Sequence, residues 1–234
     1  MLGGLPPIDF IITFGIVIFT AIGLHEYAHC KVADMAGDPT PRSYGRVTLN
    51  LTKHFEPTGT MMIIFTMMSG FGIGWGRPAP FNPTLMRNPR WDLLASVVAG
   101  PASNILQAAV WAIMLRIAMI TSPGAVFTAD GATFLGMLFQ YGVFVNLLLA
   151  VFNLIPLGPL DGHWIIGQFL PEKPRLYWYR FHRKVGMYGL IAVIIGSQLV
   201  RYQTRGEIDP FWDLIGPPVY FMYSFFTGLP GIML

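Results

Sequence analysis

Long stretches without a charged residue most constrain what this chain can fold into. A membrane-spanning helix needs about 20 predominantly apolar residues. One charge-free stretch, Phe10 to Leu24, runs directly into His25. Five others lie between Glu56 and Arg77, between Asp92 and Arg116, between Asp130 and Asp161, between Lys184 and Arg201, and after Asp213. The pattern predicts a polytopic membrane protein.

Composition excludes several other classes. Hydrophobic residues make up 53% of the 234 residues and charged residues 12%, whereas soluble domains carry about 25% charged residues. Disorder requires low hydrophobicity, and a disulfide scaffold is excluded because Cys30 is the only cysteine. The net charge of +3 is spread along the chain, which argues against a nucleic-acid partner. We expect one membrane-embedded domain over residues 1–234.

The first apolar stretch predicts a retained helix of roughly residues 8–36. Asp9 stands where a signal peptide would carry a basic segment, and no cleavage motif of small residues follows. The stretch over residues 58–75 differs, because its second half is rich in glycine and makes a poor lipid-facing helix. We therefore predict that residues 58–75 form a re-entrant or interfacial segment.

The distribution of Lys and Arg predicts the topology. If residues 58–75 do not cross, twelve of the fifteen basic residues fall in the two connections 31–92 and 157–184, on one side. If they cross, the split is seven against eight and carries no information. The positive-inside rule then places both connections in the cytoplasm. We predict about five crossings of the cell membrane, with the N-terminus outside and the C-terminus inside.

Two connecting segments have recognisable patterns. Residues 46–52, Arg-Val-Thr-Leu-Asn-Leu-Thr, alternate polar and apolar residues and predict a short strand. Residues 76–83 contain a proline every two or three positions and predict extended or turn structure. The expected fold class is all-α and polytopic, with about five transmembrane helices, one re-entrant or interfacial segment and a short membrane-associated β element.

The sequence His25-Glu26-Tyr27-Ala28-His29 is an HExxH motif. Residues i and i+4 share one face of a helix, so both imidazoles can bind one Zn²⁺. The glutamate then lies near the open position of the metal, where it can deprotonate a bound water. The motif ends an apolar helix, where ionisable groups are costly and indicate function. Packed histidines that only satisfy each other are the alternative.

A catalytic zinc also needs a third protein ligand. Asp161 ends a charge-free stretch, after Pro156 and Pro159 have broken the helix, and Gly162 permits a sharp turn. Broken helices occur at membrane depth only where they line a cavity or are buried in protein. An ordinary interfacial turn is the alternative, and the remaining histidines are further candidates: His54, His163 and His182.

The depth of these groups tests the topology independently. His25, His29 and Asp161 all lie near the C-terminal ends of their apolar stretches. They can meet only if the two helices run parallel, which requires an odd number of crossings between them. One crossing lies between them if residues 58–75 are re-entrant. Both arguments place the site toward the cytoplasmic face.

These motifs together resemble the site-2 metalloproteases, which cleave within the membrane. HExxH on an early helix is followed by Asn-x-x-Pro-x-x-x-x-Asp-Gly at residues 153–162. The chain is similar to the compact prokaryotic branch without PDZ or CBS domains in five further segments: residues 46–50, 54–60, 74–83, 87–90 and 99–104. The resemblance implies that His25, His29 and Asp161 bind one zinc ion per chain and that Glu26 is catalytic. It implies transmembrane proteins or peptides as substrates, and it leaves the oligomeric state open.

Three asparagines could take part in the chemistry. Asn104 and Asn153 are candidate amide donors to the oxyanion that forms during peptide hydrolysis. Asn146 lies seven residues before Asn153, which predicts an inward polar stripe on the same helix face. Interhelical hydrogen bonding without a catalytic role is the alternative for each.

The predicted strand could hold the substrate. A transmembrane peptide must unwind before its carbonyl can be attacked, and its freed backbone then needs partners. An edge strand offers them by β-addition, and internal pairing is the alternative. The candidate residues are Val47, Thr48, Leu49, Asn50 and Leu51.

Two other functional classes stay open at this point. A metal- or proton-handling transporter could use the same His, Glu and Asp groups, although no inverted repeat is visible. A catalytically silent scaffold would need the ligands but not Glu26. The sequence favours a zinc endopeptidase that acts on membrane-embedded substrates.

Overall fold

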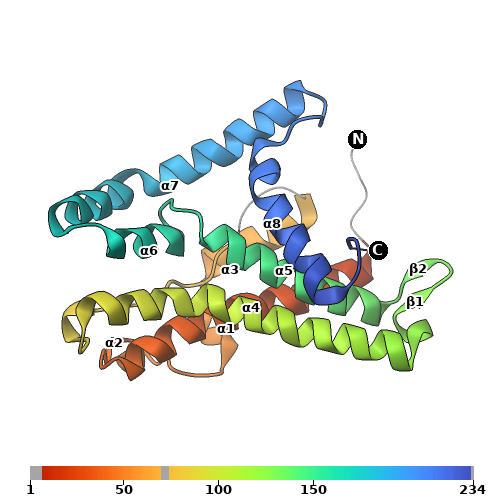
Figure 1. Cartoon of the computed structure of the whole chain (residues 1–234), viewed down its shortest axis with the longest axis horizontal. Coiled ribbons are helices and arrows are strands. Elements are labelled where there is room, and N and C mark those ends of the chain that lie inside the picture. Colours follow the sequence, from red (N-terminus) through yellow and green to blue (C-terminus); the bar gives the residue numbers. More distant parts are fainter. Residues whose placement is uncertain (1–6, 70–73, 233–234) are drawn as a thin grey trace.

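The computed structural model describes residues 7–69 and 74–232, and these form an almost entirely helical protein (Figure 1). The longer helices are α1 (Ile8–Met35), α3 (Pro57–Ser69), α4 (Pro89–Thr121), α5 (Phe134–Asn153), α6 (Asp161–Phe169), α7 (Glu172–Gln203) and α8 (Pro210–Thr227). The short elements are α2 (Thr40–Ser43), the 3₁₀ turns η1 (Leu51–His54), η2 (Pro83–Leu85) and η3 (Pro123–Ala125), and the strands β1 (Phe127–Thr128) and β2 (Gly131–Ala132).

Three helices, α1, α4 and α5, form the centre of the molecule (Figure 1). Val17 and Ala21 of α1 pack against Tyr141 and Val145 of α5 in a buried cluster. A second cluster joins the C-terminal part of α1 to the start of α4, and its members are Ala33, Ala36, Met86, Leu93 and Val97. Small residues such as alanine at these contacts let neighbouring helices approach closely. The HExxH motif lies between the two clusters along α1.

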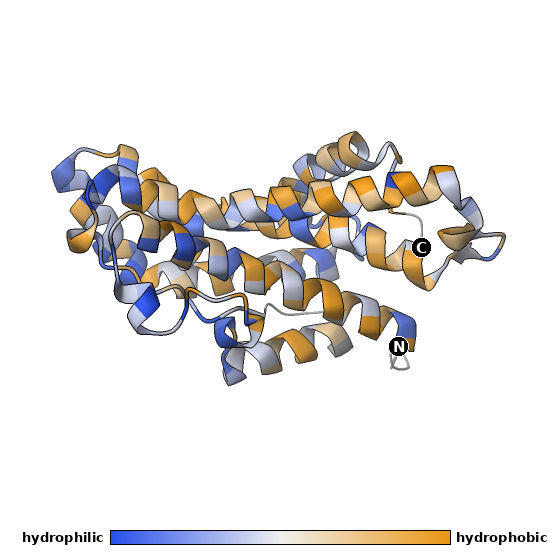
Figure 2. Ribbon diagram, turned by 90° about the horizontal axis from the view of Figure 1, so that it is seen from below, coloured by the Kyte–Doolittle hydropathy of each residue, from blue (hydrophilic) through white to orange (hydrophobic). Residues whose placement is uncertain are grey.

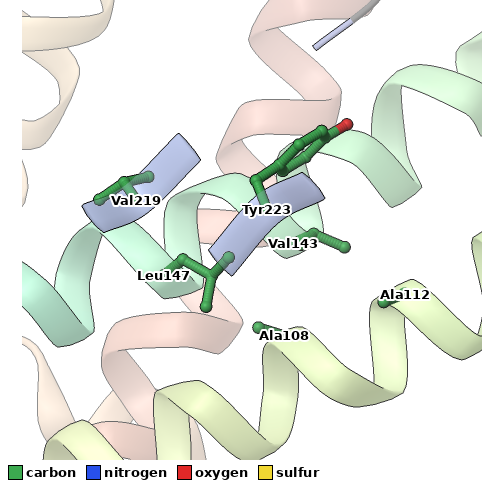
Figure 3. Close-up of a cluster of buried hydrophobic side chains, with 6 residues drawn as sticks. All are labelled: Ala108, Ala112, Val143, Leu147, Val219 and Tyr223. Carbon is green, nitrogen blue, oxygen red and sulfur yellow. The ribbon is translucent and has the colours of Figure 1, made fainter. Parts of the chain in front are cut away.

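The last helix completes the bundle from the other side. α8 packs on α4 and α5 through a buried cluster shown in Figure 3: Ala108, Ala112, Val143, Leu147, Val219 and Tyr223. The ring of Tyr223 is fully buried, and its hydroxyl donates to Gln140 of α5 at 3.2 Å. A buried phenol needs such a partner, so this bond fixes the position of α8 along α5.

Four helices of the described residues are long and apolar enough to cross a membrane: α1, α4, α5 and α7. The helix α3 has 13 residues, so it is about 20 Å long, less than the hydrocarbon core of about 30 Å. This length agrees with a segment that does not cross by itself. α8 has 18 residues but contains Asp213, Pro217 and Pro218, which lower its hydropathy.

Hydrophilic residues gather mainly at one end of the molecule, while the helices between the ends consist mostly of apolar residues (Figure 2). That end is formed by α2, the start of α4, α6 and the start of α7 (Figure 1). It contains the two connections in which the sequence places twelve basic residues. The all-α polytopic fold class is confirmed.

The predicted strand at residues 46–52 is wrong. Residues 47–49 form bends and residues 51–54 form η1. The backbone here is satisfied locally, because the Asn50 amide donates to Thr48 Oγ1 and the Lys53 amide to the Asn50 carbonyl. Thr and Asn side chains compete with a ladder in this way. The β element of the structure is instead the β1–β2 hairpin between α4 and α5.

The expected return of the C-terminus to the end that carries His25 and Asp161 is also wrong. Arg116, near the end of α4, donates to the carbonyls of Phe225 and Phe226 at the end of α8. α4 runs away from those residues, so α8 ends at the opposite end. The reason is that α7 leaves the bundle at an angle (Figure 1), and α8 therefore begins beside the C-terminal part of α5.

Candidate metal centre

His25 and His29 lie on one face of α1 and are almost fully buried against α4. Their Nε2 atoms are 3.0 Å apart. The Nδ1–H of His25 donates to Asn104 Oδ1 at 2.6 Å, and the Nδ1–H of His29 donates to the Ser96 carbonyl at 2.8 Å. These acceptors place the proton of each ring on Nδ1. Both Nε2 lone pairs are therefore directed at the same point, as in metal sites with oriented histidines.

Asp161 reaches this point from a different part of the chain. α5 ends at Asn153, an irregular turn follows, and Asp161 is the first residue of α6. Its Oδ2 atom lies 3.3 Å from the Nε2 atoms of both histidines. Gly162 does not form the turn expected from the sequence. It lies in the helix, where an added Cβ would come within 2.2 Å of the Leu154 carbonyl oxygen.

The three groups fit a bound cation. The ligand atoms of His25, His29 and Asp161 all lie within 4.8 Å of one another. Two atoms bound at about 2.0–2.1 Å to a tetrahedral zinc lie about 3.3 Å apart, which matches these separations. The Asp161 Oδ2 atom is buried and has no hydrogen-bond partner among the described residues. Without a cation, two lone pairs and a carboxylate would face each other in a buried site.

The charge of Asp161 follows from its neighbours. Burial raises the pKa of this carboxyl, but the positive charge and hydrogen bonds that His29 and His25 supply when protonated outweigh burial and hold its pKa well below the usual range. A cation bound between the three groups would supply that positive charge in place of the protons. The group is therefore an anion at neutral pH. An anionic oxygen with two neutral imidazole nitrogens is a donor set that Zn²⁺ accepts.

Glu26 lies near His25, His29 and Asp161 and is covered by a neighbouring segment. An added Cβ at Gly76 would lie 3.2 Å from Glu26 Oε1 and 2.7 Å from Ile22 Cγ2. The backbone at Gly76 therefore packs directly on the glutamate. The other oxygen, Glu26 Oε2, is buried without a hydrogen-bond partner among the described residues. A buried carboxylate oxygen without a partner can act as a general base.

The sequence profile of peptidase family M50 matches residues 13–197, which include all of these groups. The chain belongs to peptidase family M50. As a member of this site-2 protease family it is a zinc metalloprotease.

Curated relatives agree with this assignment. The chain is 36% identical over 160 residues to the candidate zinc metalloprotease YwhC of Bacillus subtilis, covering 68% of this chain and 70% of that protein. It is 30% identical over 173 residues to the candidate zinc metalloprotease Rip2 of Mycolicibacterium smegmatis, covering 72% of this chain and 63% of that protein. No solved structure matches the chain significantly.

The segment that covers Glu26 in this M50 protease is held by Arg46. The side chain of Arg46 is 2% exposed, and its guanidinium donates to the carbonyls of Arg77 and Pro78. His54 is also fully buried, and its carbonyl accepts the Arg77 amide at 2.7 Å. Burial and the Arg46 cation lower the pKa of His54, so it is neutral at pH 7. Arg46 and His54 therefore position residues 76–78.

The asparagine candidates differ in how many of their side-chain donors are occupied. Both N–H groups of the Asn104 amide are used, by the Ala21 carbonyl at 3.2 Å and by Asn146 Oδ1 at 2.9 Å. Asn104 thus orients His25. The Asn153 amide donates to the Leu149 carbonyl at 2.9 Å, which leaves one N–H. His163 and His182 line a pocket whose wall also includes Gly158 and Pro159, shortly before Asp161 in the chain.

Substitutions of Asn104 and Asn153 are expected to have different effects, because the two side chains make different hydrogen bonds. We expect Asn104→Ala to weaken zinc binding by about 10–100-fold, because a ligand loses the partner that orients it. We expect Asn153→Ala to leave zinc affinity unchanged and to lower the cleavage rate by about 100–1,000-fold, the effect of losing one oxyanion donor. Zinc titration against a competing chelator, together with cleavage rates, separates the two. Unchanged zinc affinity in Asn104→Ala would contradict its orienting role.

Gly100 is a further functional position that the sequence reasoning did not single out. It lies on α4 directly against the two imidazoles, where an added Cβ would be 2.3 Å from His29 Nε2 and 2.7 Å from His25 Cε1. Only glycine lets α4 approach the HExxH face this closely. The available signal was its place in the small-residue run Ala99-Gly100-Pro101-Ala102, which is typical of close helix contacts.

Gly100→Ala is expected to displace both imidazoles and to lower the cleavage rate by about a hundredfold. Zinc content and cleavage are measured on the same preparation. Gly196→Ala is the matched control, since it lies in α7 with nothing within 4 Å of the new Cβ. The control should retain full activity. Wild-type zinc affinity and cleavage in Gly100→Ala would show that the close approach does not matter.

Proposed function

We propose that this protein is an intramembrane endopeptidase that hydrolyses peptide bonds in or near transmembrane segments of other membrane proteins. One observation carries the proposal: two histidines, an aspartate and a buried glutamate converge within a bundle of apolar helices. Ionisable groups in such a setting are costly and mark a functional site. Membership of the M50 family supports a protease over a transporter or a scaffold.

His25, His29 and Asp161 would hold the zinc ion, one per chain. Zinc supplies a Lewis acid that polarises the peptide carbonyl and lowers the pKa of a bound water toward 7. Glu26 would accept the proton of the attacking water through its free oxygen and return it to the leaving nitrogen. Asn153, with its remaining N–H, is the candidate donor to the developing oxyanion. Asn104 and the Ser96 carbonyl keep both imidazoles in the binding tautomer.

The protein around Glu26 encloses the site and lowers its local dielectric constant, which favours electrostatic catalysis. Residues 76–78 and the HExxH face of α1 enclose Glu26 and restrict access of solvent water. Electrostatic interactions among the catalytic groups are stronger in such a low-dielectric site.

A substrate helix must unwind to present its carbonyl, and its freed backbone groups then need partners in the protein. This requirement favours substrates that enter as locally extended segments.

The orientation in the membrane is also part of the proposal. Asp161 is the first residue of α6, which lies at the hydrophilic end of the molecule (Figures 1 and 2). The connections at this end carry twelve of the fifteen basic residues. By the positive-inside rule this end faces the cytoplasm. The start of α1 at Ile8 is then on the outer side, and the protein acts in regulated intramembrane proteolysis at the cell membrane.

Cleavage by the purified protein tests this function directly. The protein is reconstituted in liposomes, its zinc content is measured, and cleavage of a co-reconstituted transmembrane peptide is followed by mass spectrometry. We expect one zinc per chain and cleavage that a chelator abolishes and added zinc restores. Zinc flux across the liposome without cleavage would support a transporter instead. Bound zinc with neither activity would support a scaffold.

A further inference from the structure

A pocket of about 700 Å³ lies beside the metal centre, between α6, α7 and Pro78. Two of its wall segments also form the centre. Gly158 and Pro159 lie three and two residues before Asp161, and Pro78 belongs to the segment 76–78 that covers Glu26. A peptide held with one carbonyl at the zinc would pass these walls. The pocket therefore lies where residues next to the scissile bond would be.

Two histidines in the pocket wall offer backbone-binding groups. His182 Nδ1 accepts the Gly158 amide at 3.0 Å, so its proton is on Nε2, which is buried without a partner among the described residues. His163 Nδ1–H donates to the Leu160 carbonyl, which leaves its Nε2 as an acceptor. The two rings lie 5.2 Å apart. One donor and one acceptor match the C=O and N–H groups of an extended peptide.

The remaining wall of the pocket consists of apolar side chains and two arginines. Trp164, Leu176 and Met187 supply apolar surface, while Arg180 and Arg183 also line the pocket and are exposed. The arginines lie one turn apart on α7, on neighbouring positions of one helix face. Within residues 7–69 and 74–232, neither has a carboxylate within 4.0 Å. The wall therefore carries two uncompensated positive charges.

We propose that this pocket is a substrate subsite that binds an extended segment next to the scissile bond and selects segments with acidic side chains. The inference rests on the proposed function and names its substrate class. His163 and His182 bind the backbone, and Arg180 and Arg183 attract carboxylates. Cytoplasmic segments next to transmembrane helices are usually rich in Lys and Arg. Two unpaired arginines would repel most of them, so the subsite narrows the set of substrates.

Charge reversal tests the subsite by binding, independently of cleavage. The zinc-loaded full chain with Glu26→Gln is placed in nanodiscs, and affinities are measured for two transmembrane peptides that differ only in a Glu-Glu or Lys-Lys pair beside the cleaved region. We expect the acidic peptide to bind about fivefold more tightly, the effect of two exposed ion pairs. In Arg180→Glu/Arg183→Glu the preference should reverse. Lys184→Glu, one residue along the helix and outside the pocket wall, is the matched control and should keep it.

The outcomes separate this inference from the proposed function. An unchanged preference in the charge-reversed variant, or no binding of either peptide, overturns the subsite. A preference that follows the phosphatidylglycerol content of the nanodisc rather than the peptide charge assigns the arginines to lipid headgroups and also overturns it. If the active protein cleaves neither peptide but the preference still reverses, the subsite stands and the protease function fails. Unchanged zinc content in each variant shows that it has folded.

Discussion

Glu26→Gln is expected to abolish cleavage while the protein retains its zinc. The glutamine side chain has nearly the same size, so the packing against Gly76 is kept. It cannot accept the proton of the attacking water, nor deliver one to the leaving nitrogen. General acid–base catalysis contributes about 100–10,000-fold, and the same group serves in both steps. We therefore expect a loss of at least about a thousandfold in the cleavage rate.

Zinc content and cleavage rate are measured side by side for this variant. Glu207→Gln, an exposed glutamate between α7 and α8, is the control and should behave as wild type. Substantial residual cleavage in Glu26→Gln would show that another base serves the reaction. Loss of zinc together with activity would mean that Glu26 is needed for metal binding, and this result would contradict its role in proton transfer.

Asp161→Asn is expected to remove the zinc. The substitution replaces an anionic ligand by a neutral amide and leaves two imidazoles to hold the metal in a buried site. Loss of an outer-shell partner weakens metal binding by about 10–100-fold, so loss of a ligand should exceed a hundredfold. Cleavage should become undetectable at zinc concentrations that saturate the wild type.

The measurement is zinc per chain after dialysis, followed by titration against a chelator of known affinity. Asp213→Asn, an exposed aspartate on α8, should retain wild-type zinc content. Wild-type zinc affinity in Asp161→Asn would show that the third ligand is another group. A second test then replaces His163, the histidine nearest in sequence to Asp161.

The sequence alone predicts those parts of the candidate site whose geometry depends only on residues close together in the chain. The HExxH spacing places His25 and His29 on one helix face whatever the rest of the fold does. Asp161 could be predicted because a carboxylate after a long charge-free stretch needs a partner. Asn104 could not be assigned in this way. Whether its amide faces an oxyanion or His25 depends on the rotation of α4 against α1, and the structure gives both of its N–H groups to other acceptors.

The strand at residues 46–52 shows a different kind of error. Its alternating pattern is real, but a short strand is stable only if another strand pairs with it. Thr48 and Asn50 satisfy the local backbone instead, and the side chain of Arg46 is drawn into the protein to hold residues 77 and 78. With no strand at residues 47–51, β-addition at this segment loses its structural basis.

The sequence by itself determined that this chain forms apolar helices, that His25 and His29 share one face of the first of them, and that basic residues gather at one end. These properties depend on hydropathy, spacing and charge, which are local to each segment. Only the tertiary structure decided that Gly100 lies against the imidazoles, that Arg46 holds the segment over Glu26, and that a pocket with two unpaired arginines adjoins the site. Those features depend on how helices distant in sequence are rotated and tilted against each other, and no single segment encodes that geometry.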